Sequence, residues 1–229
     1  MKKAICLLSG GLDSTTALYI ALREGCEVTA LTLHYGQLHE KEMEFARALA
    51  ADLKVPHYML SIPLPWKGSA LLDSGIPIPV GRDESQIKAE IPVTYVPARN
   101  SIFLSLAASL AEAEGAEAIF IGANALDYSG YPDCRPEYLK AFEEMLRKGT
   151  KAGVEGRTVR IEAPLLRLSK KVIVELGHAL GVPFEKTWSC YKGGEVPCGE
   201  CDACLLRAKG FREAGLEDPL ISHAAPALR

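Results

Sequence analysis

A glycine-rich hexapeptide near the start of the chain, Ser-Gly-Gly-Leu-Asp-Ser over residues 9–14, has the composition of an anion-binding turn. An apolar run precedes it and a helical apolar pattern follows it, so it would join a strand to a helix N-terminus. That terminus carries unpaired N–H groups and the positive end of the helix dipole. The pattern predicts a phosphate or pyrophosphate site, although a strand-to-helix turn without a ligand would also fit. The residues of the predicted site are Leu8, Ser9, Gly10, Gly11, Leu12, Asp13, Ser14 and Thr15.

Two other phosphate motifs are absent from this stretch. No Gly-Lys-Ser/Thr follows the glycines, as it would in a Walker A loop, and the Gly-x-Gly-x-x-Gly of dinucleotide sites is missing. The hexapeptide instead resembles the pyrophosphatase loop (PP-loop), S-G-G-x-D-S, of enzymes that split ATP into AMP and pyrophosphate. That resemblance implies attack on the α-phosphate and an adenylated intermediate.

Four cysteines lie close together near the end of the chain, separated by seven, two and two residues. These spacings let four sulfurs turn toward one ion, and thiolate-rich sites bind zinc or an iron–sulfur cluster. Zinc is favoured, because a ferredoxin-like run would be tighter and repeated. A closed four-cysteine site is structural rather than catalytic. The predicted ligands are Cys190, Cys198, Cys201 and Cys204.

Three basic residues stand in the first turns of predicted helices. They are Arg99 in one helix, and Lys170 and Lys171 in another. A cation in the first turn opposes the helix dipole unless an anion docks there. Pyrophosphate binding by Lys170 or Lys171 is therefore favoured over a plain surface role.

A polar loop follows the fourth predicted strand, at the edge where open α/β sheets bind ligands. Its side chains could hydrogen-bond a purine-like heterocycle, but a turn rich in Asn, Asp and Gly that caps itself would fit as well. The candidate substrate contacts are Asn124, Asp127, Tyr131 and Asp133.

Cys134 follows in the same loop, beside Arg135. A nearby cation can lower a thiol pKa and make the cysteine reactive. A plain loop thiol or a substrate contact is nevertheless favoured over a nucleophile. Cys6 and Cys26 fall in apolar segments and are expected in the core.

Short apolar runs alternate with helical periods along most of the chain, which predicts an α/β fold with a doubly wound parallel five-stranded sheet. Residues 63–95 are rich in proline and glycine, so we expect them to lack regular structure over most of their length and to face the substrate. Within them, residues 82–85 could equally be solvated surface. Strands are expected over 3–8, 27–35, 57–62, 118–122 and 159–162, and helices over 13–23, 40–53, 97–115, 137–148 and 170–180, with one more beginning near residue 202.

Length and charge narrow the class of protein. A chain of 229 residues predicts one main domain, here a nucleotide-binding domain over 1–186 with a zinc-binding segment over 187–229 packed on it. The net charge of −3 argues against broad binding of nucleic acid. No apolar run reaches the roughly 18–20 residues of a membrane helix, so we expect a cytoplasmic protein without membrane contact.

Several motifs occur together and in a fixed order. They are the hexapeptide, His-Tyr-Gly-Gln at 34–37, Tyr-Val-Pro-Ala-Arg-Asn at 95–100, Gly-Ala-Asn at 122–124, Tyr-Pro-Asp-Cys-Arg-Pro at 131–136 and the four cysteines. As a set they resemble the 7-cyano-7-deazaguanine synthases of queuosine precursor biosynthesis, over nearly all of the chain.

That resemblance implies an ATP-dependent carbon–nitrogen ligase. Its substrates would be ATP, 7-carboxy-7-deazaguanine and ammonia, and its product the nitrile, formed through an adenylated acid and an adenylated amide. It further implies Mg²⁺ with ATP, one structural zinc per chain and a homodimer. The candidate catalytic residues are Asp13, Arg99, Lys170 and Lys171, and the candidate substrate contacts include Arg135.

Two functions of other classes use a similar nucleotide fold. A tRNA thiolase would need a persulfide cysteine or an iron–sulfur cluster, and an ATP-binding sensor would need neither a substrate pocket nor the cysteine cluster. The acidic net charge and the closed set of four cysteines favour the synthase. An NAD or GMP synthetase shares the loop but lacks the cluster.

Overall fold

A computed structural model describes residues 1–126 and 131–222. Five strands form one sheet in the order β3-β2-β1-β4-β5, and every neighbouring pair is parallel. The predicted α/β fold with a parallel five-stranded sheet is therefore confirmed. The strands are β1 (Lys3–Leu7), β2 (Glu27–His34), β3 (His57–Ser61), β4 (Ala118–Phe120) and β5 (Arg160–Glu162).

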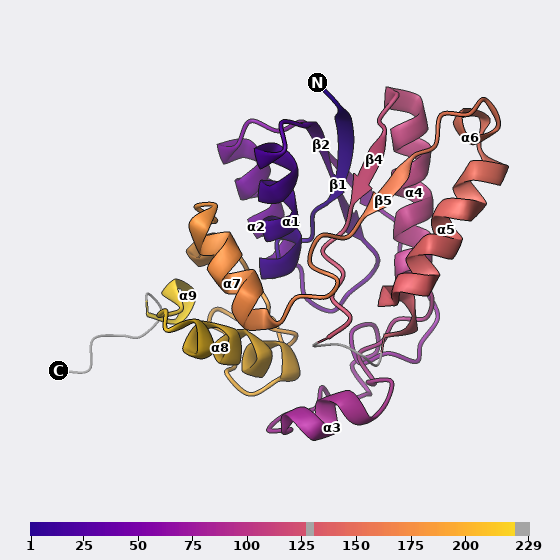
Figure 1. The fold of residues 1–229 in the computed structure, drawn as a ribbon. Helices are drawn as coiled ribbons and strands as arrows, with labels where there is room; N and C mark the ends of the chain where they lie inside the picture. Colours follow the sequence, from indigo (N-terminus) through magenta and orange to yellow (C-terminus); the bar gives the residue numbers. More distant parts are fainter. Residues whose placement is uncertain (127–130, 223–229) are drawn as a thin grey trace.

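Helices cover both faces of the sheet, which makes it doubly wound (Figure 1). Successive side chains of β1 point to opposite faces of the sheet. Ala4 and Cys6 pack with the helices on one face, and Ile5 and Leu7 pack with those on the other. Cys6 and Cys26 are buried, as expected. On the first face lie α1 (Leu12–Arg23) and α2 (Lys41–Asp52), and on the second lie α4 (Arg99–Glu114) and α5 (Pro136–Gly149).

A second group of helices adjoins α1 (Figure 1). Its members are α7 (Lys170–Ala179) and α8 (Asp202–Ala214), with α9 (Pro219–Ser222) as a single turn, whereas the single turn α6 (Lys151–Val154) lies beside α5. Phe211 of α8 shares a core cluster with Leu12 of α1 and Ile173 of α7, so the C-terminal segment packs on these two helices. The division at residues 186 and 187 stays a prediction.

The long loop between β3 and α4 is more ordered than its composition suggested. It contains a helix, α3 (Glu84–Ala89), and Asp83 caps this helix by accepting a hydrogen bond from the N–H of Gln86 at 2.9 Å. Arg82 forms a bidentate ion pair with the buried carboxylate of Asp202 at the start of α8. Residues 82–85 are therefore not merely solvated surface: they tie the loop to the C-terminal segment.

The chain turns sharply between β1 and α1. Gly10 has φ of +87°, in the left-handed region, and a Cβ at this position would lie 2.1 Å from the carbonyl oxygen of Glu42 and 2.7 Å from the N atom of Ala46. A side chain there would overlap the backbone of α2. The loop and α2 can therefore meet this closely because residue 10 is glycine.

Within the described ranges, none of the helices combines the length and apolar character needed to span a bilayer.

The contact at Gly10 predicts a large effect of substitution. Gly10→Ala should cost about 1–2 kcal/mol for the left-handed conformation and about 1–3 kcal/mol more for overpacking against α2. Gly25→Ala is the matched control, because Gly25 has φ of +77° but nothing within 4 Å of the added Cβ. Urea unfolding of both variants measures the difference. Equal losses of stability would show that the contact with α2 is not tight.

Candidate active site

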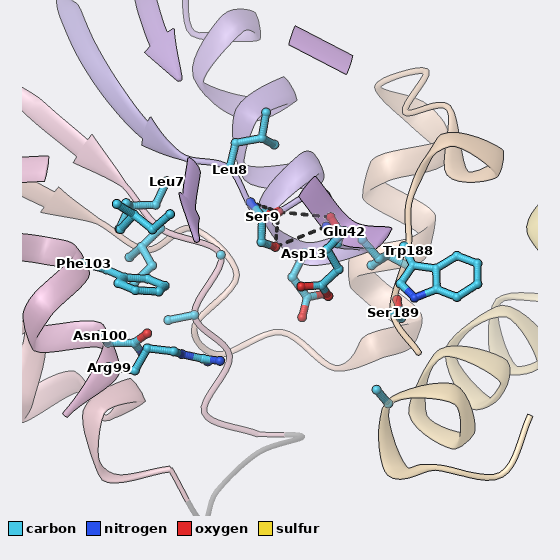
Figure 2. Close-up of a pocket in the computed structure, with 18 of the residues that line it drawn as sticks. Leu7, Leu8, Ser9, Asp13, Glu42, Arg99, Asn100, Phe103, Trp188 and Ser189 are labelled. Atoms are coloured by element: carbon cyan, nitrogen blue, oxygen red, sulfur yellow. Dashed lines mark hydrogen bonds between the residues drawn. The ribbon is translucent and has the colours of Figure 1, made fainter. Parts of the chain in front are cut away.

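A cavity of about 250 Å³ opens at the carboxyl edge of the sheet (Figure 2). Its walls come from the segments that follow β1, β2 and β4, from the first turns of α1, α4 and α7, and from residues 188–191. Ligands of open α/β sheets bind at this edge. The cavity therefore lies where the hexapeptide was expected to work.

The hexapeptide holds its own shape through its two serines. Ser9 Oγ lies 3.0 Å from Ser14 Oγ and accepts a hydrogen bond from the N–H of Gly11 at 3.2 Å. Ser14 Oγ accepts from the N–H of Ser9 at 3.2 Å. Six of the eight predicted residues line the cavity, whereas Gly10 lies against α2 and Thr15 is fully buried. Those six are Leu8, Ser9, Gly11, Leu12, Asp13 and Ser14.

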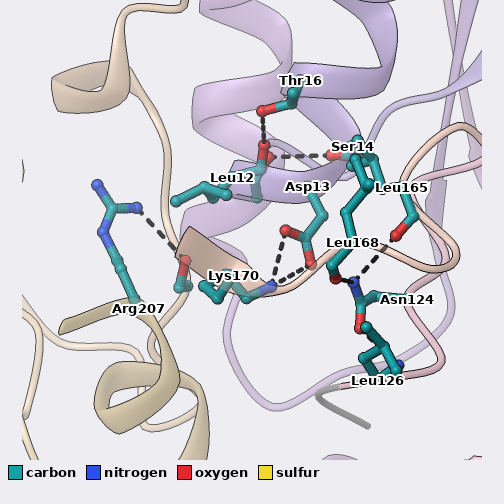
Figure 3. Close-up of polar contacts among 12 residues, drawn as sticks. Leu12, Asp13, Ser14, Thr16, Asn124, Leu126, Leu165, Leu168, Lys170 and Arg207 are labelled. Atoms are coloured by element: carbon teal, nitrogen blue, oxygen red, sulfur yellow. Dashed lines mark hydrogen bonds and ion pairs between the residues drawn. The ribbon is translucent and has the colours of Figure 1, made fainter. Parts of the chain in front are cut away.

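Asp13 and Lys170 form an ion pair inside the cavity (Figure 3). Lys170 Nζ donates to both carboxylate oxygens of Asp13, at 2.7 and 2.8 Å. The lysine stem is buried under α8, where a Cβ on Gly210 would come within 2.5 Å of Lys170 Cγ. The pair thus balances the charge of Asp13, a carboxylate that would otherwise repel phosphate, and fixes an ammonium group beside the loop.

The two neighbouring lysines of α7 have different surroundings. Lys171 is half-exposed, does not line the cavity and pairs with Glu175 at 3.6 Å, one turn further along the same helix. Of the two lysines, Lys170 alone meets the cavity.

Arg99 forms the opposite wall beside Phe103 (Figure 2). Its guanidinium carbon lies 5.6 Å from the ring centre of Tyr35 and 5.8 Å from that of Phe103, and it donates to the Tyr35 hydroxyl at 3.3 Å. In the part of the chain that the structure describes, no carboxylate forms an ion pair with Arg99. A cation held on aromatic faces without an ion-pair partner suits an anionic ligand.

Asp133 supports α4 rather than facing the cavity. Its Oδ2 accepts from the backbone N–H of Asn100 at 3.0 Å, and Asn100 Nδ2 donates to the carbonyl of Asp133 at 3.1 Å. Asp133 is buried and does not line the cavity. The structure therefore places this expected substrate contact as a non-local cap of the helix that carries Arg99.

Cys134 lines the cavity as a thiol. Burial and the nearby Asp133 carboxylate raise its pKa to about 11. Arg135 is exposed and does not line the cavity. The expected lowering of the Cys134 pKa by Arg135 is thus wrong, and a role of Cys134 as nucleophile is disfavoured.

The other expected substrate contacts divide as follows. Asn124 lines the cavity, but its Nδ2 donates to the carbonyls of Leu165 and Leu168 at 3.0 and 2.7 Å (Figure 3). The donor group of this amide therefore supports the loop. Tyr131 also lines the cavity, with its hydroxyl 2.7 Å from Thr94 Oγ1. Asp127 lies outside the described residues.

The four predicted cysteine ligands come together in space. The sulfurs of Cys190, Cys198, Cys201 and Cys204 all lie within 4.8 Å of one another. The N–H of Cys198 donates to Cys190 Sγ at 3.3 Å, which helps stabilise thiolate charge. Four buried or half-buried thiolates this close need a cation to neutralise them, so the donor set fits a metal ion.

Trp188 links this cluster to the hexapeptide over residues 9–14. The backbone N–H of Trp188 donates to the carbonyl of Gly10 at 2.9 Å, and its indole N–H donates to the carbonyl of Cys190 at 3.0 Å. The segment between loop and cluster also forms part of the cavity wall. The cysteine cluster therefore fixes one wall of the pocket.

Sequence reasoning missed two charged residues of the pocket. Arg207 of α8 is buried, pairs with Asp218 at 2.6 Å and donates to Thr187 Oγ1 at 2.8 Å. Glu42 of α2 lines the cavity, and burial raises the pKa of its carboxyl to about 7. Neither residue belongs to a local motif, so no signal in the sequence distinguished them from other helix charges.

Comparison with known proteins supplies a family and close relatives. The family model described as "Queuosine biosynthesis protein QueC" matches residues 3–215. The chain is 53% identical to the 7-cyano-7-deazaguanine synthase of Trichodesmium erythraeum (strain IMS101), over 96% of this chain and 100% of the relative. It is 55% identical to the 7-cyano-7-deazaguanine synthase of Thermoplasma acidophilum (strain ATCC 25905 / DSM 1728 / JCM 9062 / NBRC 15155 / AMRC-C165), over 96% of this chain and 91% of that one.

Metal removal should loosen the pocket wall before the sheet. With a chelator present, amide hydrogen exchange should rise in residues 188–204 while β1 and β2 keep their protection, because the four sulfurs hold this segment together. Cys201→Ser is the control, since the chelator should change it little further. Unchanged exchange over 188–204 in the metal-free wild type would refute a structural metal.

Proposed function

The chain belongs to the QueC family, and on that premise we propose that it is a 7-cyano-7-deazaguanine synthase: an ATP-dependent ligase that converts 7-carboxy-7-deazaguanine and ammonia into the nitrile. The observation that carries the proposal is identity above one half, over nearly the whole length, to relatives of that name. The pocket adds support, because it joins the hexapeptide, an arginine without an ion-pair partner among the described residues, and a buried lysine.

The chemistry requires two activations of the same carbon. The substrate carboxylate first attacks the α-phosphate of ATP, pyrophosphate leaves, and an acyl adenylate forms. Ammonia displaces AMP to give the amide. A second ATP then activates the amide oxygen, which leaves with AMP as the nitrile forms. Adenylation is needed because an unactivated carboxylate oxygen is a poor leaving group.

We assign phosphate binding to the loop and to Lys170. The N-terminus of α1 and the loop N–H groups favour negative charge, and Lys170 adds an ammonium group held by Asp13. Mg²⁺ would enter with ATP and neutralise phosphate charge. The Asp13 carboxylate, which faces the cavity, fits the preference of this ion for oxygen ligands.

We assign recognition of the substrate carboxylate to Arg99. Its guanidinium lines the same cavity as the loop and lacks a carboxylate partner among the described residues. Asp133 acts through Arg99 by capping α4. Exclusion of water by the surrounding walls would protect the adenylate from hydrolysis.

Four further properties belong to the same proposal. The metal is zinc, because four thiolates in a closed set suit this ion, and its role is structural. The protein is a homodimer that works in the cytoplasm, and residues 187–229 form a zinc-binding segment distinct from the domain over 1–186.

The direct test of the function is incubation with ATP, ammonium and 7-carboxy-7-deazaguanine, followed by detection of the nitrile by mass spectrometry. No nitrile from the zinc-loaded protein would reject the proposal.

Loss of Asp13 should stop turnover without unfolding the protein. Asp13→Ala removes the partner of Lys170 at the phosphate loop, so we expect a loss of about 10²-fold or more in pyrophosphate release. Circular dichroism checks that the fold persists. Substrate-dependent pyrophosphate release near the wild-type rate would contradict the assignment.

Substitution of the two lysines of α7 should have different effects on activity. Lys170→Met removes the ammonium group in the cavity and should lower pyrophosphate release about as much as Asp13→Ala. Lys171→Met changes an exposed ion pair with Glu175 and should leave the rate within about twofold. Steady-state rates of both variants provide the measurement, and equal losses would place the two lysines in the same role.

A further inference from the structure

Glu42 is a charged residue of the cavity that the proposed mechanism leaves without a task. It projects from α2 into the space that Asp13 and Ser9 also face (Figure 2). Across the described ranges, no residue donates a hydrogen bond to its carboxyl or forms an ion pair with it. Its backbone is held tightly, because its carbonyl oxygen packs against Gly10. The carboxyl is thus firmly placed and has no ion-pair partner among the described residues; burial raises its pKa more than the charge of Arg99, which acts on it from a longer distance, lowers it.

Three oxygens surround the space above Gly11. From the position that a Cβ of residue 11 would occupy, Ser9 Oγ lies at 3.2 Å, the carbonyl oxygen of Trp188 at 3.4 Å and Glu42 Oε1 at 3.7 Å. Among the described residues, no N–H or O–H group donates to the Trp188 carbonyl. A hydroxyl, a carbonyl and a carboxylate together form a set of acceptors for a small cationic donor.

The charge of Glu42 is unfavourable for a pocket that binds only anions. ATP and the substrate carboxylate are both negative, so a second carboxylate beside the phosphate loop opposes them unless a cation accompanies it. Asp13 already has Lys170 as its counter-charge. The proposed reaction supplies two small cations, Mg²⁺ and ammonium, and ammonium is the one that can donate hydrogen bonds to this set of acceptors.

We propose that Glu42 binds the ammonium ion above Gly11, together with Ser9 Oγ and the Trp188 carbonyl. Glu42 then accepts a proton from this ion, and the ammonia that results is the nucleophile. This inference rests on the proposed function. Ammonia is mostly protonated at neutral pH, and the ammonium ion has no lone pair with which to attack. The raised pKa of the Glu42 carboxyl, about 7, suits proton exchange near neutral pH.

The step balances as follows. Ammonium gives one proton to the Glu42 carboxylate and becomes ammonia. The nitrogen lone pair forms the new C–N bond at the acyl carbon, and the bond from that carbon to the phosphate oxygen breaks. AMP leaves with that electron pair. Its phosphate takes the second proton from the nitrogen, which leaves the neutral amide.

The test separates adenylation from aminolysis in Glu42→Gln. Exchange of labelled pyrophosphate into ATP, dependent on 7-carboxy-7-deazaguanine and measured without ammonium, should stay within about threefold of wild type. Amide and nitrile formation from ammonium should fall about 10²-fold or more, because a general base is lost. Hydroxylamine is largely unprotonated at neutral pH, so it should restore acyl transfer and yield the hydroxamate.

Glu44→Gln is the matched control, because Glu44 is an exposed residue of the same helix and loses the same charge. It should behave as wild type with ammonium. An equal loss of exchange and aminolysis in Glu42→Gln, or a loss that excess Mg²⁺ reverses, would overturn the inference in favour of a role in ATP binding. Failure of the wild type itself to catalyse acid-dependent exchange would reject the proposed function instead.

Discussion

The close backbone contact at Gly10 is the constraint on which the pocket depends. On one side, the carbonyl of Glu42 and the N atom of Ala46 lie where a Cβ would be. On the other, the carbonyl of Gly10 accepts the N–H of Trp188, which leads directly into the cysteine cluster. Three distant parts of the chain therefore meet at one glycine. A change there would move the hexapeptide, the carboxyl of Glu42 and the wall held by the cysteine cluster together.

The charged side chains of the cavity differ in whether they have an ion-pair partner. Lys170 neutralises Asp13 on the α7 side of the loop, whereas Glu42 lies on the α2 side without an ion-pair partner among the described residues. Arg99 stands across the cavity on two aromatic rings, also without an ion-pair partner there. An unpaired cation and an unpaired carboxyl in one small cavity suit a reaction with one anionic and one cationic substrate. This is the charge pattern of joining a carboxylate to ammonium.

Local features of the sequence were predictable, and long-range contacts were not. The loop over 8–15 and the four cysteines could be recognised as candidate sites, because such sites depend on spacing within a few residues, and the structure brings the four sulfurs together. Lys170 and Lys171 could not be separated, since the packing of α8 decides which one is buried. The bond from the N–H of Asn100 to Asp133 Oδ2 could not be predicted, because the two residues are 33 positions apart. Glu42 sits in an ordinary amphipathic helix, and its importance comes from the turn at Gly10 that α2 packs against.

The central claim is that two oxygens of the substrate attack the α-phosphate of ATP in turn, first a carboxylate oxygen of the acid and then the oxygen of the amide. Substrate labelled with ¹⁸O in both carboxylate oxygens tests this most directly, with mass spectrometry of the products. The account predicts that each AMP carries one ¹⁸O atom and that neither pyrophosphate nor the nitrile carries any. Label in inorganic phosphate or in water, with unlabelled AMP, would contradict it.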